Sequence, residues 1–74
     1  MNYIVQEMQT TNGVTSLVPP NVYSTRNEAD AKFHTILAAA AVSNVEEHSA
    51  IMYTQDGGLV RAETYVHGEL PESV

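Results

Sequence analysis

The order of apolar and polar residues divides the chain into four short extended stretches around one long helical stretch. The extended stretches are rich in β-branched and aromatic residues, and the last of them alternates regularly between the two classes. They are residues 3–8, 14–18, 48–54 and 59–67. Asn12-Gly13 and the QDGG sequence at 55–58 are turn sequences, because Asn and Gly tolerate positive φ. We therefore predict two β-hairpins.

The helical stretch is predicted to run from residue 26 to residue 42. Thr25 followed by Glu28 matches a capping box, in which the hydroxyl accepts an unpaired N–H and the carboxylate reaches back. Ser24 is a competing cap one residue earlier, and the helix is expected to end at residues 43–44, where Asn can adopt a left-handed conformation.

The predicted order is therefore ββαββ, an α+β fold with an antiparallel sheet and one helix packed on one face. Residues 1–68 are expected to form a single domain, and residues 69–74 a flexible acidic tail. The pattern leaves open how the two hairpins meet, either edge to edge or through another subunit.

Two stripes of small or apolar residues follow the helix. The first is expected to pack on the sheet and consists of Ala29, Phe33, Ile36, Leu37, Ala40 and Asn44. The second, on the opposite side, consists of Ala31, Thr35, Ala38 and Val42. Small side chains at this spacing let a second helix approach closely, although alanine also tolerates exposure on a helix.

The size of the chain favours packing of a second helix on the second stripe over simple exposure of its alanines. A domain of 74 residues has a small core. Because it contains no cysteine, neither disulfides nor thiolate metal sites can stabilise it. We therefore predict a homodimer or higher oligomer formed through the helix.

Charge limits the classes of partner. The chain carries 3 Lys and Arg against 9 Asp and Glu, a net charge of -6. Such a surface repels duplex phosphates, so binding of duplex nucleic acid is not expected. No basic leader, no apolar run long enough to cross a membrane and no cysteine are present, which suits the cytoplasm.

The last extended stretch carries a candidate ligand-binding face. Arg61, Glu63, Tyr65 and His67 are expected to point to one side, with Tyr53 as a neighbour from the adjacent strand. Such a face can stack a base or ribose and pair a guanidinium with a phosphate. The alternative is a solvated outer sheet face. The other side of the strand is predicted to carry Val60, Ala62, Thr64 and Val66.

A second candidate lies at the predicted helix start. Tyr23 and Arg26 flank its hydroxyl residues, and free N–H groups at a helix N-terminus favour anions. Ordinary capping explains the same residues. His34 stands four residues after Asp30 and is either a further contact or a surface pair.

Metal binding and catalysis find little support in the sequence. Glu46, Glu47 and His48 are ligand types, but consecutive residues do not converge easily on one ion. His48 or His67 could act as a general acid or base, yet no serine can be tied to a histidine and a carboxylate. We therefore expect no metal, no cofactor and no enzymatic activity.

Residues 1–13 and 26–58 resemble a group of small phage and prophage proteins of Gram-positive gut bacteria. In that group a short β-hairpin precedes a helix with an FHxILxxAAVS pattern, and the sequence HSA opens the next strand. Asn27 and Ala31 fit the pattern loosely. The other matching positions are Phe33, His34, Ile36, Leu37, Ala40, Ala41, Val42, Ser43, His48, Ser49 and Ala50.

The resemblance implies a phage accessory protein made in the cytoplasm of a bacterial host. By analogy with unrelated small phage proteins, we predict an oligomeric protein that sequesters a nucleotide immune signal. The signal would be a cyclic ADP-ribose type or a cyclic dinucleotide, as in Thoeris or CBASS defence. The ligand-binding residues would be Tyr23, Arg26, His34, Tyr53, Arg61, Tyr65 and His67. A protein-interaction module acting on a host protein is the alternative, and a hydrolase using His48 or His67 is a third.

Overall fold

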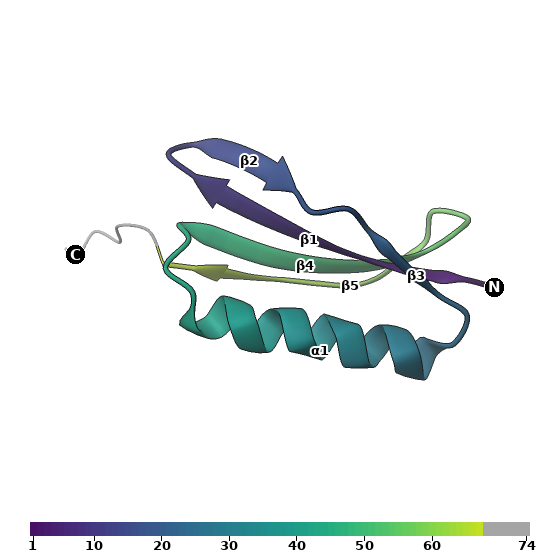
Figure 1. Cartoon of the computed structure of the whole chain (residues 1–74). Helices are drawn as coiled ribbons and strands as arrows, with labels where there is room; N and C mark the ends of the chain where they lie inside the picture. Colours follow the sequence, from purple (N-terminus) through teal and green to yellow (C-terminus); the bar gives the residue numbers. More distant parts are fainter. Residues whose placement is uncertain (68–74) are drawn as a thin grey trace.

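The computed structural model describes residues 1–67, which form five strands and one helix (Figure 1). The elements are β1 Tyr3–Thr11, β2 Val14–Leu17, β3 Asn21–Tyr23, α1 Arg26–Val42, β4 Glu47–Thr54 and β5 Leu59–Val66. The helix bounds agree with the prediction, and four of the strands agree within three residues. β3 was not predicted, and the predicted tail at 69–74 lies outside the described residues.

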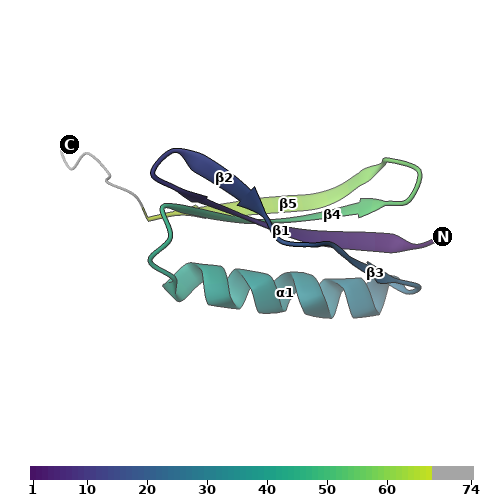
Figure 2. The same cartoon turned by 45° about the horizontal axis from the view of Figure 1, so that its top comes forward.

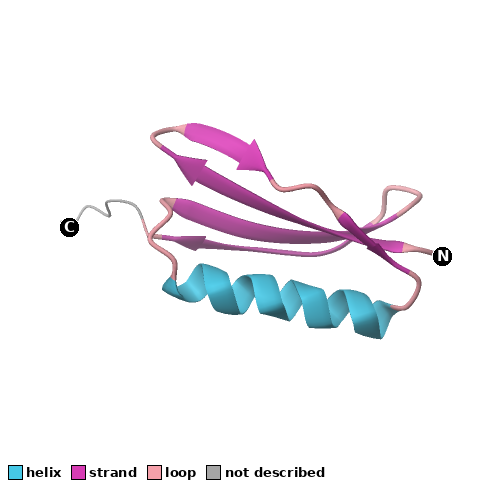
Figure 3. Ribbon diagram, viewed as in Figure 1, coloured by secondary structure: helices cyan, strands magenta, loops and turns pink. Residues whose placement is uncertain are grey.

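The two hairpins join edge to edge within one chain. The sheet order is β2-β1-β4-β5, and β1 pairs antiparallel with β4 from Tyr3 opposite Thr54 to Thr10 opposite Glu47. Figure 3 shows the resulting antiparallel sheet with the helix along it. The first and last hairpins are thus the two halves of a continuous sheet.

One long strand pairs with two short ones along the same edge. The second half of β1 pairs with β2, and its first half pairs with β3. Pro19 and Pro20 separate the two short strands, because proline has no N–H for a ladder hydrogen bond. The Val18 N–H, just before them, still donates to the Glu7 carbonyl at 2.9 Å.

The predicted turns are confirmed at both hairpins, and at the helix start the hydroxyl half of the predicted capping box is confirmed. Asn12 and Gly13 both have positive φ, at 53° and 77°, as a two-residue hairpin turn requires. At the helix, the Glu28 N–H donates to Thr25 Oγ1 at 3.2 Å. Among residues 1–67 no hydrogen bond from the Thr25 N–H to the Glu28 carboxylate is present, so the second half of the box is not formed. Thr25, and not Ser24, is therefore the N-cap.

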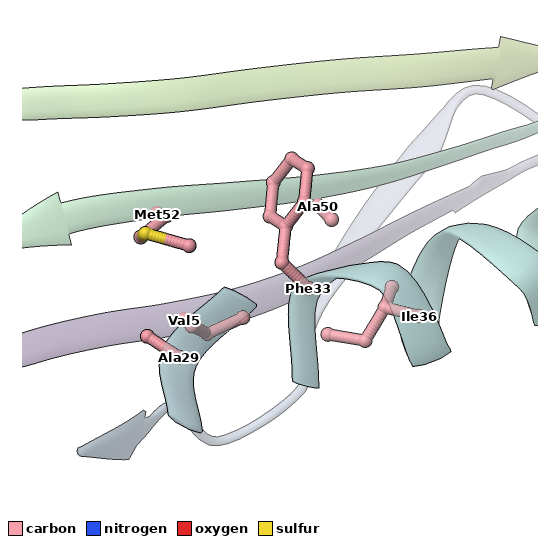
Figure 4. Packing of buried hydrophobic residues seen from close by; sticks show 6 residues of the cluster. All are labelled: Val5, Ala29, Phe33, Ile36, Ala50 and Met52. Carbon is pink, nitrogen blue, oxygen red and sulfur yellow. The ribbon is translucent and has the colours of Figure 1, made fainter. Parts of the chain in front are cut away.

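The core is a single layer of side chains between α1 and the sheet. Phe33 lies at its centre and is fully buried, with Met52 and Val5 to one side of its ring and Ala50 to the other (Figure 4). The buried apolar residues are Val5, Ala29, Phe33, Ile36, Ala40, Ala50 and Met52. The helix stripe is confirmed except at Asn44, which is exposed because the helix ends before it and cannot place it on the stripe.

Only one face of the sheet is covered by a described element. In Figures 1 and 2 α1 runs along one side of the strands, and nothing among residues 1–67 lies against the other side. That second side is called the outer face here. From the strand pairing it carries Ile4, Gln6, Met8, Thr10, Thr15, Leu17, Val22, Glu47, Ser49, Ile51, Tyr53, Leu59, Ala62, Thr64 and Val66.

The second stripe of the helix faces away from the sheet. Ala31, Thr35, Ala38 and Val42 are all exposed in the single chain, and Val42 is 85% exposed. The Thr35 hydroxyl donates to the Ala31 carbonyl at 2.9 Å, which occupies its hydrogen within the helix. Association through this stripe stays a prediction.

Candidate functional site

A β-bulge in β5 decides which side chains face the helix. Met52 lies opposite Arg61, but Tyr53 lies opposite Leu59, so Val60 is an extra residue in the ladder. Val60 packs against the core, and the prediction that it shares a side of the strand with Ala62, Thr64 and Val66 is wrong.

Beyond the bulge, every second residue of β5 lies on the helix side of the sheet. Arg61, Glu63 and Tyr65 lie opposite the buried Met52, Ala50 and His48, so they share the face of those residues. We call Arg61, Glu63, Tyr65 and His67 the β5 row.

The guanidinium of Arg61 begins the β5 row. It lies over the ring of Phe33, 4.6 Å from the ring centroid, which is a cation–π contact. Its Nη2 is 3.2 Å from Glu63 Oε2, and about a third of the side chain remains exposed, 32%. Arg61 is therefore both anchored to the core and open to solvent.

Tyr65 and His67 end the β5 row as a parallel pair of rings. Their centroids are 6.2 Å apart and their planes differ by 5°. The Nε2–H of His67 donates to the Ala40 carbonyl at 2.7 Å, which fixes the imidazole against the last turns of α1. Tyr65 is 39% exposed, so a planar group can reach its ring.

Tyr53 does not join the β5 row. It alternates with the buried Met52 and lies opposite Ile4, on the outer face, where its hydroxyl donates to Gln6 Oε1 at 3.5 Å. The prediction that Tyr53 neighbours the β5 row is wrong, because strand alternation places it on the other side of the sheet.

The residues predicted at the helix start lie far from the end of the β5 row. Arg26 begins α1, and its Nε is 3.4 Å from Asp30 Oδ1. Ala40, which His67 contacts, is fourteen residues further on, or about 21 Å along a helix. Tyr23 packs against the core beside the start of α1. Within one chain these residues do not form one pocket with Tyr65 and His67.

His34 lies on the helix between the two ends. It is exposed, and its ring meets the ring of Phe33 edge-on, with centroids 6.1 Å apart. Since Arg61 lies over the same Phe33 ring, His34 and Arg61 contact one aromatic side chain. The structure therefore relates His34 to the β5 row through Phe33.

A buried polar network lies under the end of the helix, and the sequence did not reveal it. His48 is 4% exposed and lies between two partners: its Nδ1 is 3.1 Å from Ser43 Oγ, and its Nε2 contacts Glu7 Oε2. Gln9 donates to the same carboxylate oxygen at 3.1 Å. A serine, a histidine and a carboxylate are thus connected in series across α1, β4 and β1.

The electrostatics of Glu7 follow from this network. Burial alone would raise the pKa of Glu7, but hydrogen bonds from His48 and Gln9 and the positive charges of His48 and Lys32 outweigh it. The pKa of Glu7 therefore lies below its ordinary value. The carboxylate stays ionised and accepts the Nε2–H of His48.

The geometry of the network favours a structural role over nucleophilic catalysis. The Ser43 hydroxyl also lies 3.4 Å from the Ala40 carbonyl and accepts from the Val45 N–H at 3.4 Å. These contacts cap the helix end, and the burial of His48 leaves little room for a substrate between it and Ser43.

The described part of the chain has neither a cluster of metal ligands nor a helix that could span a membrane. Residues 1–67 contain no group of three or more His, Asp or Glu side chains placed to hold a metal ion. Within the same residues, α1 is not long and apolar enough to cross a bilayer.

Comparison of the chain with protein-family models, with curated proteins and with solved structures gives no match. The function must therefore be inferred from the geometry of the β5 row, the helix start and the outer face.

Proposed function

We propose that the chain is a phage or prophage protein that binds and sequesters a small anionic nucleotide signal without turning it over. The observation that supports this is the β5 row, which sets a guanidinium, a carboxylate and two parallel rings along one strand on the helix side of the sheet.

Each member of the row suits one part of a nucleotide. The Arg61 guanidinium can pair with a phosphate through two parallel N–H donors. The exposed ring of Tyr65 can stack a base. The Glu63 carboxylate can accept hydrogen bonds from ribose hydroxyls, as acidic residues do in dinucleotide-binding proteins.

The surroundings of Arg61 determine how tightly a phosphate is held. Arg61 is paired with Glu63, so a phosphate competes with that carboxylate for the same N–H groups. The net charge of -6 adds a long-range repulsion that salt screens. Binding is therefore expected to tighten when a ligand engages both Glu63 and Arg61, which favours nucleosides with phosphates over inorganic phosphate.

A thermal-shift screen tests the proposal. The purified protein is melted with cyclic ADP-ribose isomers, cyclic dinucleotides and inorganic phosphate, and a ligand at 100 times its dissociation constant adds about 2.7 kcal/mol. Arg61→Gln is expected to abolish the shift. Arg26→Gln is the matched control, since Arg26 is also exposed and paired with a carboxylate but lies at the start of α1, away from Tyr65 and His67.

Recovery of the ligand separates sequestration from hydrolysis. Heat denaturation of the complex should release the nucleotide unchanged, because sequestration breaks no bond in the ligand. Flat melting curves across the nucleotide panel would overturn the proposal, and recovery of a cleaved product would replace it with an enzymatic function.

A protein-interaction module is the second candidate function, and a separate observation favours it. Four large apolar side chains are more than half exposed on the outer face, where no described element covers them: Leu17, Val22, Leu59 and Val66. Exposed apolar patches of this kind mark interaction surfaces in small proteins.

A further inference from the structure

We propose that the outer face binds the outer face of a second copy of this chain, so that two sheets pack face to face with both helices outside. This inference concerns the assembly and is independent of the nucleotide proposal. It depends on the charge, the hydrogen bonding and the extent of the outer face.

Charge is distributed unevenly between the two sides of the sheet. Among the described residues, Glu47 is the one charged residue on the outer face, and it lies at the end of β4. Every other Asp, Glu, Lys or Arg between positions 1 and 67 belongs to α1, to a loop or to the helix side of the sheet. The molecule therefore has an uncharged side despite a net charge of -6.

An uncharged side is what a second copy requires. Two molecules of net charge -6 repel each other, and like charges brought together at an interface cost several kcal/mol. The helix side of each copy carries the carboxylates of Glu28, Asp30 and Glu63, so contact through that side would place like charges near the interface. Contact through the outer face keeps those carboxylates apart.

Six polar residues of the outer face are hydrogen-bonded to one another in three pairs. The hydroxyls of Thr10 and Thr15 are 2.9 Å apart, and those of Ser49 and Thr64 are 2.8 Å apart. The Tyr53 hydroxyl donates to Gln6 Oε1 at 3.5 Å. A buried polar group is costly only when it loses its partner. These groups therefore need no complementary donors from a partner, and apolar packing alone can cover them.

The extent of the outer face is close to what a stable dimer needs. Four strand positions at about 4.8 Å and eight residues at about 3.3 Å give a footprint of about 20 by 26 Å. A standard interface buries about 800 Å² on each partner. The flat footprint is about 520 Å², and the corrugated outer face with its nine apolar side chains has an accessible area larger than that footprint. They are Ile4, Met8, Leu17, Val22, Ile51, Tyr53, Leu59, Ala62 and Val66.

Two sheet faces can pack on each other without specialised contacts. Packed sheets lie about 10 Å apart and rotated by about 30°, with the side chains of both faces interdigitated. A two-fold axis through the face brings the same residues together from both copies. Such a dimer gives each chain a second core, and it leaves both β5 rows and both helices exposed.

A pair of identical substitutions on the two sides of the molecule tests this assembly. Ala62, on the outer face, and Ala38, on the exposed side of α1, are both exposed alanines. The wild-type protein, Ala62→Glu and Ala38→Glu are compared by sedimentation velocity over a wide concentration range. Far-UV circular dichroism checks that each variant is folded, and Ala62→Val keeps the position apolar as a second control.

The dimer through the outer face predicts about twice the 8.1 kDa chain mass for the wild type, Ala38→Glu and Ala62→Val. Ala62→Glu is expected to raise the dimer dissociation constant by at least about tenfold, because it places an unpaired charge in an apolar interface. A monomeric wild type at millimolar concentration, or dissociation by Ala38→Glu and not by Ala62→Glu, would overturn it. The change in the melting temperature of Ala62→Glu on adding nucleotide is measured as a separate experiment. The dimer proposal and the nucleotide proposal can therefore fail independently.

Discussion

His48 Nδ1 lies 3.1 Å from Ser43 Oγ, a contact that joins the first buried residue of β4 to the residue that ends α1. Because His48 is 4% exposed, loss of the hydroxyl leaves a ring nitrogen buried without a partner. Ser43→Ala is therefore expected to lower the free energy of unfolding by about 1–3 kcal/mol. Chemical denaturation measures this change.

Ser16→Ala is the matched control for that variant. Ser16 is exposed on β2, and its replacement should change the free energy of unfolding by less than about 0.5 kcal/mol. Equal effects of the two substitutions would show that the contact between Ser43 and His48 does not stabilise the fold.

The lowered pKa of Glu7 predicts a loss of stability in acid. Burial opposes ionisation of Glu7, but the hydrogen bonds from His48 and Gln9 prevail, so the folded protein holds this proton less tightly than the unfolded chain. The contribution of ionised Glu7 to the free energy of unfolding is complete above the ordinary pKa of 4.5. It is lost as the pH falls through the lower pKa that Glu7 has in the folded protein. Thermal melts between pH 7 and pH 3 measure it.

Glu7→Gln isolates this contribution. The variant should be less stable than the wild type at pH 7, and the difference should shrink as the pH falls below 4.5, because the wild-type carboxyl then becomes neutral too. A difference that stays constant with pH would mean that the Glu7 charge does not contribute.

Gly13 tests the backbone at the first hairpin turn. Its φ is +77°, and a Cβ built there meets nothing within 4 Å, so strain and not crowding opposes a side chain. Gly13→Ala should destabilise the fold by about 1 kcal/mol or slightly more. Replacement by D-alanine in a synthetic chain should be neutral or stabilising, because a D-residue favours positive φ. Equal losses for both alanines would contradict this interpretation.

Arg61→Gln should separate binding from folding. The cation–π contact with Phe33, at 4.6 Å, contributes about 0.5–1 kcal/mol at a partly exposed site. The variant is therefore expected to remain folded, with a slightly lower melting temperature and no nucleotide-induced shift. An unfolded variant would show that Arg61 stabilises the core far more than a cation–π contact does.

The helix and the hairpin turns could be predicted because their causes are local. Thr25 and Glu28 lie three residues apart, and Asn12-Gly13 determines its own backbone conformation. The bulge at Val60 could not be predicted, since an extra residue in a ladder depends on how β4 and β5 pair. That shift also decides which side of β5 meets the helix.

The buried network of Ser43, His48 and Glu7 was not predicted from the sequence, because its residues come from three separate segments. Glu7 and His48 become neighbours only through the pairing of β1 with β4. One signal was nevertheless present: Glu7 continues the core-facing series of Tyr3 and Val5 on β1, and His48 precedes Ala50 on the core-facing side of β4. Ionisable residues at core-facing positions of two neighbouring strands predict a buried pair.

Isotope-filtered nuclear Overhauser spectroscopy on a mixture of labelled and unlabelled chains tests most directly whether the outer face is the dimer interface. We predict intermolecular contacts from the methyl groups of Ile4, Ile51 and Ala62, and none from Ala38 or Val42 on the exposed side of α1. Intermolecular contacts confined to Ala38 and Val42, or no intermolecular contact at millimolar concentration, would contradict the account.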